Sequence, residues 1–332
     1  MVTLKQIAKE VGVSQVTVSN VLNGKNRNVR REAAKRAELI RSVAARLGYR
    51  PHGAARAMRS RKSNMVGLLV EAHPLAYETI LGITEGLDHA GYLTVLSYFK
   101  AVVDRTAGKN SIGGRIFREN IVDGAIIANI SDFNYGRVEN SLPPHRIIIE
   151  SNFWHPERCI RRDEVNAGWS AAQGGYQAGY RKLLYVERNN HNDLYCYADR
   201  WAGVSRFAEE HGLGVERLQY PIFPNPDIRI PKGKVTADTA VIVSDAYFVL
   251  PVEHCMEQQG MVWGRDYGLI CTDDSNEFSV SWPELARVSF NRYEMGYQAA
   301  QMLSQILANP DAPCPSQMVR GRFIKGSTIR SA

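Results

Sequence analysis

The stretch that most constrains this chain is Thr3–Asn23, which has the pattern of two short helices joined by a tight turn. Ile7, Ala8 and Val11 recur at helical spacing and predict one apolar face. Gly12 stands where the chain has to turn sharply, and the small side chain of Ala8 allows two helices to approach closely. These features together predict a helix-turn-helix, and an ordinary helical hairpin is the alternative.

Capping residues mark where both helices begin. Thr3, with Gln6 three residues later, has the pattern of a capping box, in which each side chain bonds to the other residue's backbone. Ser14 is placed to cap the second helix, which we expect over about Gln15–Leu22. A third helix is predicted over Arg31–Leu47, because apolar residues recur there at steps of three and four.

The charge of the chain is divided unevenly. Residues 1–62 hold 15 Lys and Arg against 3 Asp and Glu, whereas residues 63–332 hold 26 against 31. The formal net charge of +7 therefore comes from one end of the chain. A basic end on a mildly acidic body predicts a polyanion partner for that end alone, which favours the helix-turn-helix over the hairpin.

The segment after the third helix has room for one short helix, over about Gly53–Met58. A helix of about two turns does not persist alone in water, so we expect it to become ordered only when something docks on it. Met58 stands among arginines, and it is either a linker residue that touches the next domain or a wedge for a minor-groove base step. The predicted minor-groove contacts of this segment are Ala55, Arg56, Met58 and Arg59.

Composition and motifs exclude several classes of protein. No apolar run approaches the 18 residues of a membrane span, and no signal-peptide pattern opens the chain, so we expect a cytoplasmic protein. The five cysteines are scattered without metal-ligand spacing and are expected to be reduced. The sequence lacks a phosphate loop, a nucleophile elbow and a metal-spaced set of His and Cys, so we expect no cofactor, no metal and no enzyme activity.

From Asn64 onward, short apolar strands alternate with helical patterns. Such alternation predicts parallel sheets with helices on both faces. The strands are expected at 65–70, 92–98, 124–128, 146–150, 183–186, 240–244, 269–271 and 319–324, and the helices at 79–90, 115–120, 164–178, 200–210, 252–259 and 293–307. The number of elements is enough for two α/β lobes.

At this point the chain resembles the LacI family of bacterial transcription regulators. The resemblance lies in the helix-turn-helix, in the following VSNVLNG and in the segment that begins LGYRP. It continues in order through GITEGLDHAGY, VDGAII, GYRKLLYV, DRWAGVSRFAEEHGL, CTDDS, WPELARV and GRFIKGST. It therefore covers nearly the whole chain.

The resemblance implies an α/β fold with an N-terminal three-helix helix-turn-helix head and a hinge, joined to a two-lobe periplasmic-binding-protein-like body with parallel sheets. The expected domains are residues 1–48 for the head, 49–63 for the hinge and 64–332 for effector binding and dimerisation. Within the body, one lobe is expected over about 64–160 with 290–316, and the other over about 161–289 with 317–327.

The resemblance also implies how the head meets DNA. The second helix would face base edges in the major groove, where Gln and Asn pair with adenine and Val touches a thymine methyl group. The implied base contacts are Gln15, Val16 and Asn20, and the implied phosphate contacts are Thr3, Ser14, Thr17, Ser19 and Asn23. Asn20 stands where most relatives have Arg, which predicts an unusual operator.

Residues that follow strands are candidates for a ligand site, because ligands of such sheets bind beyond the carboxyl ends of the strands. The effector-binding candidates in the cleft between the lobes are His73, Tyr77, Ser131, Glu150, Arg200, Asp245 and Asp273. Arg200 and Asp273 match family positions that commonly bind effectors, and their chemistry suits hydroxyl groups.

We therefore expect a sequence-specific DNA-binding regulator. The favoured form is a repressor that binds a pseudo-palindromic DNA operator as a homodimer and responds to a small polar ligand, a sugar or derivative, in the cleft. A corepressor-dependent repressor that responds to a nucleobase or other metabolite is the alternative. A solute-binding protein or an enzyme is a distant alternative. The first has no use for the basic first 62 residues, and the motifs of an enzyme site are missing.

Overall fold

A computed structural model describes residues 2–24, 31–50, 62–70, 77–99, 112–189, 195–221, 227–274 and 282–331. Contacts within the chain divide it into two units, Met1–Ser63 and Asn64–Ala332, called the head and the body below. The predicted hinge contacts Ala55, Arg56, Met58 and Arg59, and the candidate His73, lie outside the described residues.

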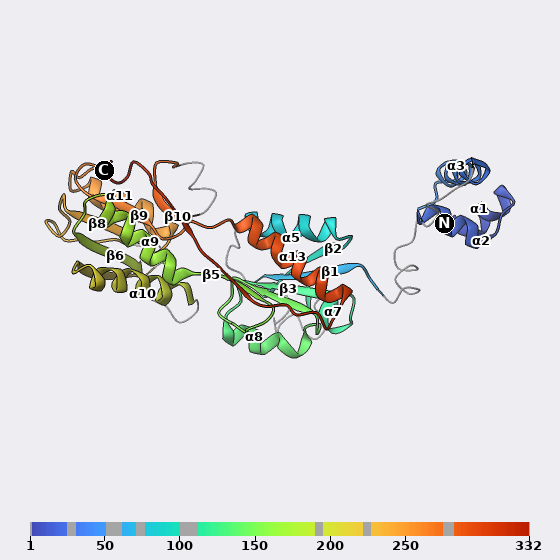
Figure 1. Ribbon diagram of the computed structural model, residues 1–332, viewed down its shortest axis with the longest axis horizontal. Coiled ribbons are helices and arrows are strands. Elements are labelled where there is room, and N and C mark those ends of the chain that lie inside the picture. Colours follow the sequence, from blue (N-terminus) through green and yellow to red (C-terminus); the bar gives the residue numbers. More distant parts are fainter. Residues whose placement is uncertain are drawn as a thin grey trace. The chain divides into compact units, whose positions relative to one another are not determined.

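The head contains the helices α1 (Leu4–Val11), α2 (Gln15–Leu22) and α3 (Arg31–Arg46), as predicted (Figure 1). Thr3 and Gln6 form the capping box, and the hydroxyl of Ser14 caps α2. Between α1 and α2 the chain turns at Gly12, whose φ of 74° lies in the left-handed region. Ile7, Val18 and Ile40 lie fully buried in the small core where the three helices meet.

The body contains two six-stranded sheets, and we call the parts built around them lobe 1 and lobe 2. Lobe 1 has the strand order β11-β5-β4-β3-β1-β2, and lobe 2 has the order β12-β10-β9-β8-β6-β7. The strands are β1 (Met65–Val70), β2 (Leu93–Tyr98), β3 (Gly124–Ala128), β4 (Arg146–Ile149), β5 (Cys159–Arg162), β6 (Lys182–Arg188), β7 (Gly214–Tyr220), β8 (Thr239–Val243), β9 (Gly268–Cys271), β10 (Ala286–Ser289), β11 (Gln317–Val319) and β12 (Arg322–Ile324). All pairs are parallel except β10 with β12.

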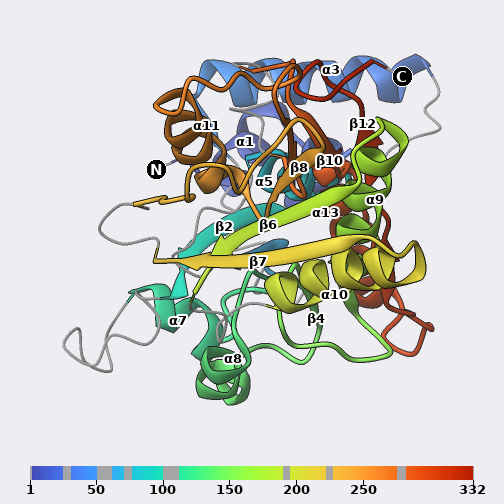
Figure 2. The same cartoon turned by 90° about the vertical axis from the view of Figure 1, so that its left-hand side faces the viewer.

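Helices cover both faces of each sheet. Alternate side chains of a buried strand therefore enter different cores. In lobe 2, Ala240 and Ile242 of β8 face one core, whereas Val241 and Val243 face the other. The body helices are α5 (Tyr77–His89), α7 (Ile112–Arg118), α8 (Asp132–Val138), α9 (Glu164–Gln177), α10 (Tyr195–Glu210), α11 (Val249–Glu257) and α13 (Arg292–Ala308). Figure 2 shows β7 at the edge of the second sheet, with α10 beside it.

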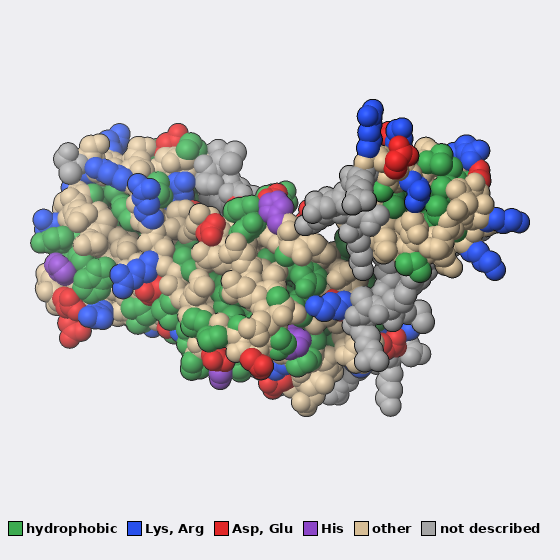
Figure 3. Space-filling view, turned by 45° about the vertical axis from the view of Figure 1, so that its right-hand side comes forward, with side chains coloured by type: hydrophobic (Ala, Val, Ile, Leu, Met, Phe, Trp, Pro, Cys, Tyr) green, Lys and Arg blue, Asp and Glu red, His purple; other side chains and the backbone are tan. Residues whose placement is uncertain are grey.

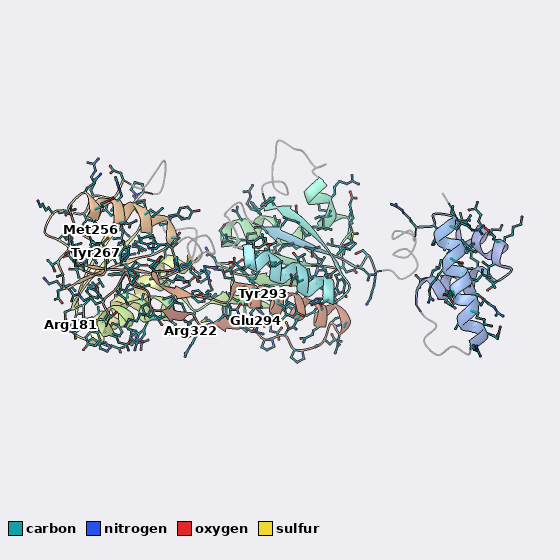
Figure 4. The ribbon with its side chains drawn as sticks, turned by 90° about the horizontal axis from the view of Figure 1, so that it is seen from above. Arg181, Met256, Tyr267, Tyr293, Glu294 and Arg322 are labelled. Atoms are coloured by element: carbon teal, nitrogen blue, oxygen red, sulfur yellow. The ribbon has the colours of Figure 1, made fainter. Side chains whose placement is uncertain are left out.

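Glycines let one helix pair in each lobe pack backbone against backbone. In lobe 2, a Cβ atom on Gly168 of α9 would lie 1.9 Å from the carbonyl oxygen of Arg200 on α10. In lobe 1, α13 lies along α5, and Tyr293, labelled at the start of α13 in Figure 4, donates a hydrogen bond to Glu85 of α5 (2.8 Å). These pairs hold the first turns of α9 and α13 in place.

Some predicted elements were wrong or missing. The single strand expected at 319–324 is two strands, β11 and β12, which belong to different lobes. Three strands were not predicted: β5 and β10, which are only four residues long, and β7, whose exposed polar residues mark a sheet edge. The sequence analysis also missed the short helix α8 and began α10 five residues late.

The order of the strands shows where the chain passes between the lobes. It leaves lobe 1 after β5 at Asp163, returns after β10 at Phe290–Asn291, and leaves again at Arg320–Gly321. The end of β5 and the start of α13 therefore both lie at the junction of the two lobes.

Candidate DNA-binding surface and interlobe site

The second helix of the head, α2, exposes one face in the described part of the chain. Val16 is 68% exposed, so its methyl groups face solvent. Gln15 next to it is also exposed, and Asn20 one turn later is partly exposed. This face therefore offers two amide groups and one aliphatic group, the set that can read adenine–thymine pairs.

The predicted phosphate contacts lie at the ends of α1 and α2. Ser14 accepts from the backbone N–H of Thr17 (3.1 Å), and their hydroxyls lie 2.8 Å apart. At the other end of α2, the side chain of Asn23 donates to the carbonyl oxygen of Ser19 (2.7 Å). Thr3 belongs to the capping box of α1. All five side chains retain exposure to solvent, so their remaining donors can reach a phosphate.

Basic side chains extend from the head. The helix α3 exposes Arg36 and Arg41, and α1 exposes Lys5 and Lys9. On the face of the head seen in Figure 3, Lys and Arg side chains project into solvent. Such charges bind phosphates without regard to sequence and place the reading helix on the duplex.

At the junction of the two lobes, three arginines meet three carboxylates. Lobe 1 contributes Glu150 after β4, Arg162 at the end of β5 and Arg292 at the start of α13. Lobe 2 contributes the remaining three residues, Glu164 at the start of α9, Arg200 of α10 and Asp273 after β9. We call these six residues the interlobe network.

Asp273 is the centre of this network. Its Oδ2 atom accepts from Arg162 and from Arg200, both at 2.9 Å. Its Oδ1 atom accepts from Arg292 and from the backbone N–H of Asp274, the latter at 2.8 Å. A carboxylate oxygen has two lone-pair sites, so all four acceptor sites of Asp273 are occupied.

Glu164 and Arg200 form a paired fork that is almost fully buried. The Nε and Nη2 atoms of Arg200 donate to the two carboxylate oxygens of Glu164 at 2.7 and 3.0 Å. Arg200 is 1% exposed, and it also donates to the carbonyl oxygen of Ser244. The second guanidinium near this carboxylate is that of Arg162, at 3.0 Å.

Glu150 holds the lobe 1 side of the network together. Its Oε1 atom lies 2.7 Å from Nη1 of Arg292 and 3.2 Å from Nε of Arg162. The Thr79 hydroxyl donates to its Oε2 atom at 3.3 Å. The backbone of Glu150 has a φ of 51°, a left-handed conformation that costs an L-residue roughly 1 kcal/mol.

Electrostatics keep the network ionised. Burial by itself would raise the pKa of the Asp273 carboxyl, but Arg292, Arg162 and Arg200 hold this pKa well below its usual range. Burial likewise opposes the charge on Arg200, whereas Glu164 and Asp273 raise its pKa well above the usual value. Near neutral pH, Asp273 therefore stays a carboxylate and Arg200 stays a guanidinium cation.

The predicted effector residues fall into two groups. Glu150, Arg200 and Asp273 come together in the network, and the buried Asp245 lies beside it, next to Ser244. Burial raises the pKa of the Asp245 carboxyl, although Arg200 opposes this effect. The other two described candidates have different positions, because Tyr77 is 67% exposed at the start of α5 and Ser131 caps α8.

Sequence reasoning missed Arg162, Glu164 and Arg292. The strand that ends at Arg162 was itself missed, and the other two residues read as ordinary helix starts. They stand where the chain passes between the lobes, and this placement is visible only once the strand order is known. Among the described residues, no group of His, Cys, Asp and Glu is suited to hold a metal ion.

A three-helix head with an exposed reading helix, carried on a two-lobe α/β body, defines a class of DNA-binding regulators. Residues 3–52 match the model of bacterial regulatory proteins of the lacI family, and residues 172–329 match the periplasmic binding protein-like domain. Catabolite control protein A of Streptococcus mutans is 39% identical over 315 residues, which cover 92% of this chain and 91% of that protein.

The chain belongs to the lacI family of bacterial regulatory proteins, and it is a DNA-binding transcription regulator, not an enzyme. Catabolite control protein A of Priestia megaterium is 26% identical over 92% of each chain. The solved lac repressor dimer, bound to operator and an anti-inducer, has the same fold, with a TM-score of 0.76, 19% identity and 99% coverage of both chains. No helix in the described part of the chain is long and apolar enough to cross a membrane.

Proposed function

We propose that this regulator is a repressor that binds a pseudo-palindromic operator as a homodimer in the cytoplasm. The observation that carries the proposal is the exposed face of α2, with Gln15, Val16 and Asn20. Two such helices on a dimer would enter successive major grooves of one operator. Relatives named as the ribose operon repressors of Haemophilus influenzae and Bacillus subtilis support the repressor role.

The two amide side chains predict an operator with adenine in the half-site. Gln15 and Asn20 would each pair with an adenine N6/N7 edge, and Val16 would touch a thymine methyl group. Thr3, Ser14, Thr17, Ser19 and Asn23 would hold the backbone of the same half-site. The hinge contacts Ala55, Arg56, Met58 and Arg59 would lie in the central minor groove, where Met58 would act as the wedge.

An exposed apolar strip on lobe 1 is the surface we assign to dimer contact. Leu96 and Tyr98 lie on one face of the edge strand β2 and are 45% and 53% exposed, and Leu93, on the other face at the start of the strand, is 66% exposed. An edge strand with such large apolar side chains is normally covered by a partner. A second copy of the chain fits, because a homodimer brings two heads to the two halves of a palindrome.

A small polar ligand is the proposed effector of the body. Glu150, Arg200, Asp245 and Asp273 lie together at the interlobe junction and can bond hydroxyl groups. A lacI-family regulator of Enterococcus faecium was solved with bound ribose, at 17% identity and a TM-score of 0.61, which favours a sugar or derivative. His73, Tyr77 and Ser131 are the remaining proposed contacts, and a corepressor is the alternative mode.

Footprinting of the full-length protein on DNA upstream of its own gene tests whether α2 binds a specific operator. We expect a palindromic protected site. The Asn20→Ala variant should lose about 1–3 kcal/mol of affinity at that site and relax the choice of one base pair in each half. Glu38→Ala, an exposed change on α3, serves as the control. Absence of any protected site, or equal binding by Asn20→Ala and the control, would refute the proposal.

The same footprint, repeated with sugars, nucleobases and related metabolites, tests which compound changes operator binding and in which direction. A compound that abolishes protection of the operator is an inducer, and a compound that increases protection is a corepressor. In Arg200→Ala the response to that compound should be lost while the operator is still protected. A response that survives this change would overturn the assignment of Arg200.

A further inference from the structure

Two arginines of lobe 1 reach across the junction to lobe 2. Arg162 closes β5, and Arg292 opens α13, so each stands at a point where the chain passes between the lobes. Both donate to the carboxylate of Asp273, which follows β9 in lobe 2. Arg292 also lies near the carbonyl oxygen of Asp274 in lobe 2, at 3.3 Å.

These contacts occupy the groups that a polar ligand would need. All four acceptor sites of Asp273 are taken, three of them by guanidinium groups. Arg200 uses four of its five N–H groups on Glu164, Ser244 and Asp273. A hydroxyl group can therefore bond Asp273 only after an arginine has left it.

A further set of contacts joins the lobes next to the network. The backbone N–H of Tyr195 in lobe 2 donates to the side chain of Asn152 in lobe 1 (2.7 Å). The guanidinium of Arg161 on β5 lies over the rings of Trp154 and Tyr195, at 4.7 and 4.9 Å from their centroids. The two lobes are thus in contact over more than the ion pairs alone.

We propose that the guanidinium groups of Arg162 and Arg292 act as a built-in ligand, which holds the two lobes together in the absence of any small molecule. The guanidinium groups supply to Asp273 the donors that the hydroxyls of a bound sugar would supply. An effector then acts by displacing these arginines from Asp273. This inference rests on the proposed role of the body as the part that senses an effector.

Charge balance supports the built-in ligand. Three positive and three negative groups meet at the junction, and each is at least 84% buried. Separation of the lobes would break the ion pairs that Arg162 and Arg292 make with Asp273. Both guanidinium groups would then lack this carboxylate as a partner. Because Glu150 pairs with the same two arginines within lobe 1, it keeps them in position to meet Asp273.

The distance between the lobes of the full-length protein tests the proposal. Spin labels on Gln173→Cys of α9 and Gln301→Cys of α13 report this distance, since both positions are exposed and lie in different lobes. The five native cysteines are buried, so the introduced ones react selectively. The labelled protein is mixed with an excess of unlabelled protein. Exchange of subunits then leaves one labelled protomer in each labelled dimer.

We expect one narrow distance distribution in ligand-free wild type, unchanged by sugars that do not alter the footprint. Arg292→Met should broaden the distribution and move it to longer distances, and Arg292→Lys, which keeps the charge, should restore part of the short distance. Arg287→Met is the matched control. Arg287 is 11% exposed, similar to Arg292, but it lies nearest Asp274 within lobe 2 (3.9 Å).

The same distribution in wild type, Arg292→Met and Arg287→Met would overturn the built-in ligand. A broad distribution in ligand-free wild type that narrows only with an effector would also overturn it. If Arg292→Met does not fold, Arg162→Gln supplies the same comparison with a smaller change. The footprint of the wild type tests the proposed function separately, because the distances do not depend on operator binding.

Discussion

Replacement of Arg200 by Met tests how much the buried network contributes to the stability of the body. Arg200 is 1% exposed and the Glu164 side chain is fully buried, so the variant leaves this carboxylate with Arg162 as its remaining guanidinium partner. Loss of one partner from a buried ion pair costs roughly 3–5 kcal/mol, and we expect a loss near 3 because Arg162 remains. The carbonyl oxygen of Ser244 keeps the Thr272 hydroxyl as a donor, so it adds little to the cost.

Urea unfolding followed by tryptophan fluorescence measures this loss in the full-length protein. All five tryptophans lie between residues 154 and 282, so the signal reports the body and not the head. The control is Arg229→Met in the same lobe, whose ion pair with Asp227 is largely exposed and should contribute almost nothing. A double variant, Glu164→Gln with Arg200→Met, should regain about 2 kcal/mol, because the uncompensated buried charge is gone. If Arg200→Met and Arg229→Met unfold at the same urea concentration, the network does not stabilise the body.

Three further changes test separate parts of the structure. Ser14→Ala removes the cap that holds the Thr17 N–H, and it should destabilise the head by about 1 kcal/mol, seen as faster hydrogen exchange of head amides with the body unaffected. Gly203→Ala puts a Cβ atom 2.0 Å from the carbonyl oxygen of Val165, so it should lower the urea midpoint of the body by an amount that corresponds to about 1–3 kcal/mol. Asp245 has a raised pKa, so the folded state binds more protons and stability falls as pH rises from the unfolded to the folded pKa. Asp245→Asn should remove this loss, and melting temperatures from pH 3.5 to 7 that run parallel in variant and wild type would contradict it.

The sequence predicted the head almost to the residue. The capping box at Thr3, the cap at Ser14 and the turn at Gly12 are local signals, because each depends on residues three or four positions apart. The strands β3, β8 and β9, which are buried along their whole length, were equally clear, as they are short apolar runs. The edge strands of the sheets were harder to predict. The single strand expected at 319–324 is divided at Arg320–Gly321 between two sheets.

The candidate ligand site was predicted only in part. Glu150, Arg200 and Asp273 were chosen because they follow strands or match a family position, and they do lie together. Nothing local distinguished Arg162 or Arg292 from any other charged residue at the end of a strand or the start of a helix. Their role depends on where β5 and α13 end in space.

The sequence by itself determined the kind of elements, the basic head and the family, since these depend on periodicity, capping and composition. Only the tertiary structure decided which charges meet, because the partners of Asp273 lie 111, 73 and 19 residues away along the chain. A buried carboxylate takes whichever donors the fold brings within about 3 Å, and burial makes those pairs obligatory. In this protein the fold brings three arginines of its own to the place that a ligand was expected to fill.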